Sequence, residues 1–224
     1  MKQGGNAVDA AVAVGFALAV TFPAAGNIGG GGFMLVRMVD GRTVAIDYRE
    51  TAPRGATAEM YQSGRSSITG YLASGVPGTV KGMHEAHRLF GKLKWSDLLQ
   101  PAIKLAEEGF VVGHGLANGL QSEANRFRQF PASWAQFCRN GDFYKAGEIL
   151  KQPDLGKTLR LIQSKGPAGF YAGETAQRFD EAMREGNGLI HAEDLRRYEA
   201  KIRRPIRAMY KGHEIITMPP PSSG

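Results

Sequence analysis

Residues 26–49 of this 224-residue sequence read GNIGGGGFMLVRMVDGRTVAIDYR, and the fold assignment depends on this stretch. The glycine-dense segment Gly26–Gly32 predicts a loop, because glycine favours neither helix nor strand. Phe33–Val39 is predicted to form a strand. Asp40-Gly41 is a strong signal for a two-residue hairpin turn. Arg42–Arg49 is therefore predicted to return antiparallel to the first strand.

An apolar segment precedes this hairpin. Ala7–Val20 carries Ala and Val on every helical face, Asn6 is a favourable N-cap residue, and Thr21–Pro23 ends the segment. The same run, following Met1, resembles a secretory signal. However, Asp9 interrupts it and it is too short to span a bilayer. We therefore predict a buried helix here.

The remainder of the chain predicts mainly helices. Thr51–Pro77 lacks periodicity and is rich in Gly and Ser, which favours a loop with short extended pieces. Helical segments follow, and two strands come last, near Ile202–Tyr210 and Glu214–Met218. The order predicts an α+β fold that is incomplete at its C-terminus, without internal repeats or the strand–helix alternation of a nucleotide-binding sheet. The predicted helices are Thr79–Phe90, Asp97–Glu108, His114–Arg128, Leu155–Ser164, Glu174–Glu185 and Ala192–Tyr198.

The formal net charge of +7 comes from Lys and Arg residues spread along the chain. They are densest in Leu195–Arg207 and Ala124–Arg139, where a solvated basic face is the ordinary interpretation. No aromatic-plus-glycine RNA-binding signature or zinc-finger spacing is present, so we predict no nucleic-acid partner. The single cysteine, Cys138, excludes an internal disulfide and a cysteine-based zinc site, and we expect a passive thiol.

Two motifs lack the context of a known catalytic or phosphate site. Gly29–Gly32 does not form G-x-G-x-x-G, and no Gly-Lys-Ser/Thr follows it. Close approach of two backbones is the favoured explanation, and contact of a ligand with the backbone is the alternative. Ser74 lacks the glycine elbow of a hydrolase, so we predict no catalytic residue within this chain.

The histidines do not predict a metal site. His84 and His87 are three residues apart on a predicted helix, whereas a zinc-protease helix places its histidines four apart around a glutamate. His114, His191 and His213 lie near the ends of predicted elements, where capping or solvent exposure accounts for them. We therefore predict no bound metal.

Arg49 is the candidate substrate-binding residue. Strand alternation places it on the same face as Ala45 and Asp47, opposite Ile46 and Tyr48. A guanidinium can hold a carboxylate by two parallel hydrogen bonds, which a lysine cannot match in geometry. From the residues alone, an ion pair with Asp47 or a plain surface arginine is the preferred alternative.

Several motifs follow one another over nearly the whole chain: residues 4–11 (GGNAVDAA), 26–34 (GNIGGGGFM), 47–53 (DYRETAP), 75–79 (GVPGT), 99–102 (LQPA), 169–171 (GFY) and 219–224 (PPPSSG). In this order they resemble the γ-glutamyltranspeptidase family. The resemblance implies the four-layer αββα sandwich of N-terminal-nucleophile hydrolases, made jointly by two subunits cut from one precursor. Residues 1–224 would be part of a single large-subunit domain.

The resemblance also implies a chemistry. In the family, a threonine exposed by self-cleavage attacks the γ-carbonyl of glutathione or another γ-glutamyl compound, and water or an amino-acid or peptide acceptor releases the product. No metal or organic cofactor is required, and the threonine belongs to the small subunit, outside this chain. Arg49 matches the arginine that binds the α-carboxylate of the γ-glutamyl group. The family is usually exported to the periplasm, cell surface or medium, although no signal is visible here.

Two departures leave alternatives open. Only three residues precede the first motif, and the chain stops before the small subunit, so the fragment alone is expected to be inactive. A cephalosporin acylase or a poly-γ-glutamate depolymerase would use the same catalytic device on other acyl groups. A catalytically silent binding module derived from the family is the alternative of another class.

Overall fold

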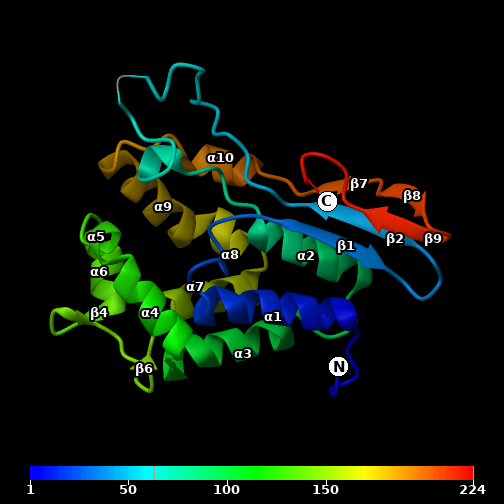
Figure 1. Cartoon of the computed structure of the whole chain (residues 1–224), viewed down its shortest axis with the longest axis horizontal. Helices are drawn as coiled ribbons and strands as arrows, with labels where there is room; N and C mark the ends of the chain where they lie inside the picture. The colour runs from blue at the N-terminus through cyan, green and yellow to red at the C-terminus, as the bar shows by residue number, and fades with distance from the viewer. Residues whose placement is uncertain (63, 224) are drawn as a thin grey trace.

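The computed structural model describes residues 1–62 and 64–223 and has mixed α and β structure, which confirms the predicted α+β class (Figure 1). Gly224, the last residue of the final motif, lies outside the described residues. The helices are α1 (Ala7–Thr21), α2 (Thr79–Phe90), α3 (Trp95–Glu108), α4 (His114–Ser122), α5 (Ala124–Phe127), α6 (Pro131–Phe137), α7 (Pro153–Lys165), α8 (Ala168–Tyr171), α9 (Gly173–Glu185) and α10 (Ala192–Arg197). The strands are β1 (Phe33–Arg37), β2 (Thr43–Asp47), β3 (Phe110–Val111), β4 (Cys138–Arg139), β5 (Asp142–Phe143), β6 (Ile149–Leu150), β7 (Lys201–Arg203), β8 (Ile206–Tyr210) and β9 (His213–Thr217).

Helix α1 begins at a capping box, as Asn6 predicts. The Asn6 side chain accepts hydrogen bonds from the backbone N–H groups of Val8 and Asp9, and the Asp9 carboxylate accepts one from the Asn6 N–H. The same carboxylate also accepts hydrogen bonds from Lys92 and Leu93. Burial alone would raise the pKa of Asp9, but these backbone hydrogen bonds bring it below its usual value. Asp9 therefore joins the start of α1 to the α2–α3 connection.

The β1–β2 hairpin forms as predicted, but its turn differs from the prediction. Arg37 pairs with Thr43, and the Met38 N–H donates to the Arg42 carbonyl at 2.8 Å. The loop therefore encloses three residues, Val39–Gly41, instead of the two predicted. Gly41 has a φ of +84°, a left-handed conformation that suits glycine in the longer turn.

The predicted strand Ile202–Tyr210 is two strands. Strand β7 pairs with β2 and completes a three-stranded sheet of order β1-β2-β7, whereas β8 pairs with β9 in a separate hairpin. Pro205 lies between β7 and β8 and has no N–H to donate to a ladder. The proline thus ends one strand and lets the chain leave the sheet.

The helical predictions fail mainly in the middle of the chain. The single helix predicted for His114–Arg128 is divided at Glu123, whose backbone is not helical, into α4 and α5. Only Leu120 of α4 is buried, so little packing energy opposes the break. The short helices α6 and α8 were not predicted.

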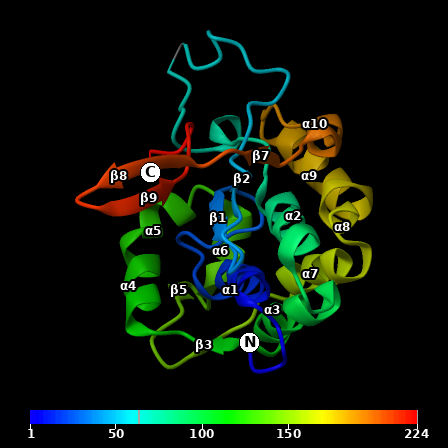
Figure 2. The same cartoon turned by 90° about the vertical axis from the view of Figure 1, so that its right-hand side faces the viewer.

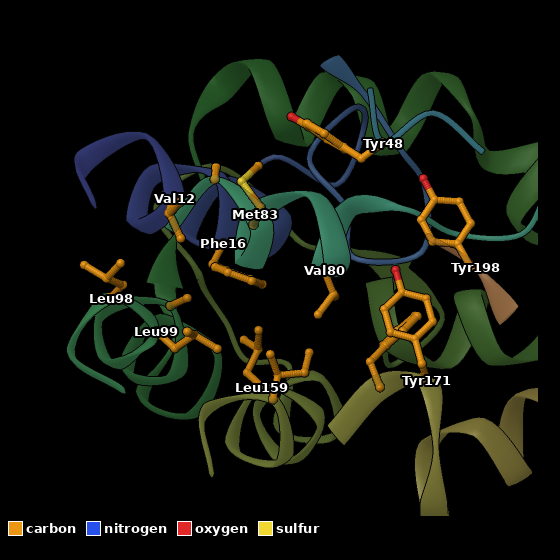
Figure 3. Close-up of a cluster of buried hydrophobic side chains, with 14 of the residues drawn as sticks. Val12, Phe16, Tyr48, Val80, Met83, Leu98, Leu99, Leu159, Tyr171 and Tyr198 are labelled. Carbon is orange, nitrogen blue, oxygen red and sulfur yellow. The ribbon is translucent and has the colours of Figure 1, made fainter. Parts of the chain in front are cut away.

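The core lies between the sheet and the helices packed on it (Figure 1). Helix α2 contacts both β2 and α1, α1 contacts α3, and α3 contacts α7. Figure 3 shows part of this core, with the labelled side chains of Val12, Phe16, Leu99 and Leu159. The Phe16 ring lies edge-on to the Trp95 ring, with the ring centroids 5.5 Å apart. In Figure 2, α4 and α5 lie on the opposite side of the hairpin from α8 and α9. The hairpin is thus anchored in the core, and this fixes the position of the residues that follow β2.

Candidate functional site

Arg49 lies two residues beyond the end of β2, beside a cavity of about 480 Å³. The side chain is exposed and borders this cavity on one side and a smaller hollow of about 130 Å³ on the other. The larger cavity is formed by the glycine loop, the residues after β2 and the end of the long loop that follows. Its lining residues are Gly29, Arg49, Glu50, Thr51, Ala52, Pro53, Ala56, Met60, Tyr61, Ala73, Ser74 and Gly75.

One neighbouring residue and two distant ones hold Arg49. Its N–H donates to the Asp47 carboxylate at 3.0 Å, and its carbonyl accepts from the Tyr198 hydroxyl at 2.9 Å. Its guanidinium donates through Nη1 to the Pro221 carbonyl at 3.1 Å. Within the described residues the guanidinium is in no ion pair, so its charge is available to an anion in the cavity.

Asp47 is the partner of another arginine. Its carboxylate accepts a hydrogen bond from Arg203 Nε at 2.7 Å, while Arg49 contributes only its backbone N–H. Arg203 lies on β7, directly across from Ala45 and on the face that Asp47 shares. The ion pair between Arg49 and Asp47, one of the two alternatives preferred from the residues alone, is therefore wrong, since Asp47 pairs with Arg203. The other alternative, a surface arginine, agrees with the exposure of Arg49.

The glycine loop brings backbones together, as its favoured interpretation predicts. Gly32 and Tyr48 exchange both backbone hydrogen bonds, at 3.0 and 3.2 Å, and the Gly30 carbonyl accepts from Gly78 at 2.7 Å. The loop thus joins β2 to the start of α2. Gly29 also lines the larger cavity, so the ligand-contact alternative stays open for that residue.

The other polar candidates have structural roles. His87 contacts the Leu93 carbonyl at 2.8 Å, and both His84 and His87 pack against Trp95. Burial lowers the pKa of His84, which favours its neutral form. Among the residues that the structure describes, no cluster of His, Cys, Asp and Glu is suited to a metal ion.

The remaining histidines lie where the sequence predicts. His191 caps α10 and contacts Asp180 at 2.7 Å through Nδ1. His114 begins α4, and His213 begins β9; both are exposed. Cys138 is half-buried, and burial raises the pKa of its thiol, which disfavours the reactive thiolate.

Several arginines of the two basic segments form ion pairs with nearby carboxylates. Arg126 pairs with Glu123 and Arg139 with Glu148 in the first segment. Arg196 and Arg197 share Glu193 in the second. These pairs are what the solvated-face interpretation expects.

Within residues 1–62 and 64–223, no helix has the length and hydropathy of a membrane span.

Sequence reasoning missed two residues at the site. Tyr198 was read only as the end of a helix, and Pro221 only as part of a motif. Both lie more than a hundred residues from Arg49 along the chain, with separations of 149 and 172 residues. No local pattern signals such contacts. Ser74 lines the cavity although it lacks a nucleophile motif.

Comparisons with known proteins agree with the motifs. The chain is 48% identical over 231 residues to a glutathione hydrolase proenzyme of Pseudomonas sp. strain A14 and 46% identical to that of Escherichia coli K12. Each alignment covers all of this chain and 40% of the relative, so the chain spans less than half the length of these relatives. An acylase ACY 1 proenzyme of Pseudomonas sp. strain SE83 is 42% identical over 235 residues and is covered to 42% of its length.

A solved structure has the same fold. The crystal structure of Helicobacter pylori gamma-glutamyltranspeptidase superposes with a TM-score of 0.96 at 45% identity, covering 99% of this chain and 66% of that one. The profile described as gamma-glutamyltranspeptidase matches residues 1–224. The chain therefore belongs to the γ-glutamyltranspeptidase family.

Proposed function

We propose that this chain is the large-subunit portion of a γ-glutamyltransferase or glutathione hydrolase, and that Arg49 binds the α-carboxylate of the γ-glutamyl group. The observation that carries the proposal is the guanidinium of Arg49 at a cavity of about 480 Å³, within the family-like segment 47–53, where no carboxylate of the described residues forms an ion pair with it. A carboxylate there would gain charge-assisted hydrogen bonds in a fixed orientation. Residues 1–224 would form part of a single domain completed by further polypeptide.

The proposed reaction uses a threonine from outside these residues. Its hydroxyl oxygen attacks the γ-carbonyl carbon while its own α-amine takes the proton. The C–N bond then breaks, and that proton passes to the departing amine. Water or the amine of an acceptor next attacks the γ-glutamyl ester and frees the threonine. Backbone amides stabilise the oxyanion, so the scheme requires neither a metal nor an organic cofactor.

The proposed partners follow from this scheme. The small subunit from the same precursor would supply the threonine, glutathione or another γ-glutamyl compound would be the donor, and amino acids or peptides would be acceptors. The proenzyme names of the bacterial relatives support a precursor. We propose the periplasm, cell surface or medium as the location.

Acylase activity is the second candidate, because the acylase proenzyme of Pseudomonas sp. SE83 is 42% identical to this chain. A mass-spectrometric assay of the full-length protein on glutathione, a glutaryl-cephalosporin and poly-γ-glutamate separates the possibilities. Release of cysteinylglycine from glutathione is the expected result. Turnover of only the cephalosporin or only the polymer would overturn the proposal in favour of an acylase or a depolymerase. No turnover of any of the three would favour a silent binding module.

A further inference from the structure

The Tyr198 hydroxyl is the hydrogen-bond donor to the carbonyl of Arg49, at 2.9 Å. Tyr198 directly follows α10 and is 4% exposed, so its ring is fixed inside the protein while its hydroxyl reaches the site. Arg49 lies outside the sheet ladder: strand β2 ends at Asp47, Tyr48 is still bonded to Gly32, and the next backbone pairing is the isolated bridge between Thr51 and Val76. Between these two pairings, the Tyr198 hydroxyl binds the carbonyl of Arg49 and the Asp47 carboxylate binds its N–H.

A second tyrosine packs against the ring of Tyr198, and a lysine binds the Tyr198 backbone. The rings of Tyr171 and Tyr198 stack with centroids 6.0 Å apart and planes 9° from parallel, and Figure 3 shows their hydroxyls on the side of Tyr48. The Lys81 ammonium lies 5.2 Å from the Tyr171 centroid and donates to the Tyr198 carbonyl. The Tyr171 hydroxyl donates to the Pro77 carbonyl at 2.9 Å and does not contact Arg49.

The backbone leaves room for this contact at one glycine. A Cβ atom on Gly78 would lie 2.0 Å from the Tyr48 carbonyl oxygen and 2.1 Å from the Tyr198 hydroxyl oxygen. Any other residue at 78 would displace the hydroxyl from Arg49 or push the start of α2 away from β2. The glycine, the buried tyrosine and Arg49 thus form one packed unit.

The hydroxyl of Tyr198 remains a donor over the working pH range. Burial raises the pKa of Tyr198 above its ordinary value, and the nearby Asp47 carboxylate acts in the same direction. The titratable groups packed around Tyr198 include Lys81, Asp47, Glu50 and Tyr48, together with the stacked Tyr171.

We propose that Tyr198 is a positioning residue for carboxylate recognition: its hydroxyl fixes the backbone at Arg49 and thereby aims the guanidinium into the cavity. The inference rests on the proposed function. The side chain of Arg49 has four rotatable bonds before the guanidinium, so a small rotation of its backbone moves the charged group by ångströms. The Pro221 carbonyl then holds the far end of the same side chain at 3.1 Å.

The test compares Tyr198→Phe with Tyr171→Phe in the full-length processed enzyme. Each variant removes one hydroxyl from the same stacked pair, but only Tyr198 contacts Arg49. The substrates are γ-glutamyl p-nitroanilide and its α-methyl ester, which lacks the charge that Arg49 would bind. For Tyr198→Phe we expect KM for the free acid to rise by about two- to tenfold with little change in kcat. We expect no such rise for the ester, nor for Tyr171→Phe on either substrate.

A double-mutant cycle with Arg49→Lys separates this inference from the function on which it rests. In the Lys background, Tyr198→Phe should raise KM no further. An unchanged KM for Arg49→Lys would overturn the proposed function. A raised KM for Arg49→Lys, with an unchanged KM for Tyr198→Phe or an equal rise on acid and ester, would overturn only the positioning role.

Poor maturation of Tyr198→Phe does not obscure the result, because KM is independent of the concentration of active enzyme. Should no mature enzyme form, 3-fluorotyrosine at position 198 keeps the ring and the donor and strengthens the hydrogen bond through a more acidic hydroxyl. KM for the free acid is then expected to differ from the wild-type value, while KM for the ester stays the same. A wild-type KM for both substrates would overturn the inference.

Discussion

Arg203 donates its Nε to the carboxylate of Asp47 at 2.7 Å, and the pair joins β7 to β2 immediately before the candidate site. Asp47 is 6% exposed, and the Arg203 side chain is 33% exposed. Asp47 is thus paired with Arg203, and within residues 1–62 and 64–223 the guanidinium of Arg49 is in no ion pair. The proposed function assigns this charge to the carboxylate of the substrate.

Replacing Asp47 by Asn should therefore destabilise the fold. The buried carboxylate is lost, Arg203 is left without its partner, and the hydrogen bond to the Arg49 N–H is weakened, so we expect about 1–3 kcal/mol less unfolding free energy. Urea unfolding followed by circular dichroism measures the change. Asp40→Asn is the matched control, because Asp40 forms an exposed pair with Arg42 and its loss should change stability little. Equal effects of the two substitutions would contradict the role of the buried pair.

Arg49→Lys should weaken substrate binding in the full-length enzyme without preventing self-cleavage. Lysine keeps the charge but cannot form two parallel hydrogen bonds to a carboxylate, so KM for glutathione should rise at least about tenfold. Steady-state kinetics and gel analysis of precursor cleavage measure the two effects. Arg65→Lys, at an exposed arginine of the long loop, is the control and should leave KM unaltered. A wild-type KM for Arg49→Lys would reject the binding role.

Acid should remove the stabilisation that Asp9 provides. The folded-state pKa of Asp9 is lowered, so its contribution is complete above the unfolded-state pKa of about 4 and is lost as the pH falls through the lower folded-state value. Asp9→Asn should reduce the unfolding free energy at neutral pH by about 1–2 kcal/mol. The difference from wild type should shrink as the pH falls below about 4. A difference that is constant over this pH range would contradict the assignment.

Gly78→Ala should be strongly unfavourable, whereas Gly119→Ala should be tolerated. The added methyl group at position 78 would meet the Tyr48 carbonyl at 2.0 Å, and we expect a loss of about 1–3 kcal/mol or more. Gly119 lies inside α4 with no atom within 4 Å of an added Cβ, so alanine there should add about 0.5–1 kcal/mol. Thermal unfolding of both variants tests this contrast. A stable Gly78→Ala protein would show that α2 and β2 approach less closely than described.

Local sequence predicted those parts of the fold that local forces determine. Asn6 marks the start of α1, and Thr79–Phe90 is the same helix in the prediction and in the structure. Asp40-Gly41 located the hairpin but not its register, because a glycine with positive φ suits both the two-residue and the three-residue turn. Pro205 indicates the end of β7, but the predicted strand Ile202–Tyr210 continues through it.

The site could be predicted only in part. Arg49 was identified from its strand position and the family-like motif, but its partners come from residues brought close by the tertiary fold. Arg203 is 156 residues from Asp47, and no sequence periodicity indicates which carboxylate an arginine will pair with over such a separation. The same holds for Tyr198, whose distant hydroxyl becomes a neighbour of Arg49 only after α10 packs against the rest of the chain.

The hydrogen bonds that Arg49 makes with Tyr198 and Pro221 can form only after those residues have been synthesised. The ribosome makes Arg49 149 residues before Tyr198 and 172 residues before Pro221. A nascent chain that has released only its first half already carries the arginine and its hairpin, yet lacks the two contacts that direct it. Under the proposed function, Arg49 can therefore bind a carboxylate in its directed position only late in translation, when the C-terminal part of this segment has left the exit tunnel and packed against β2.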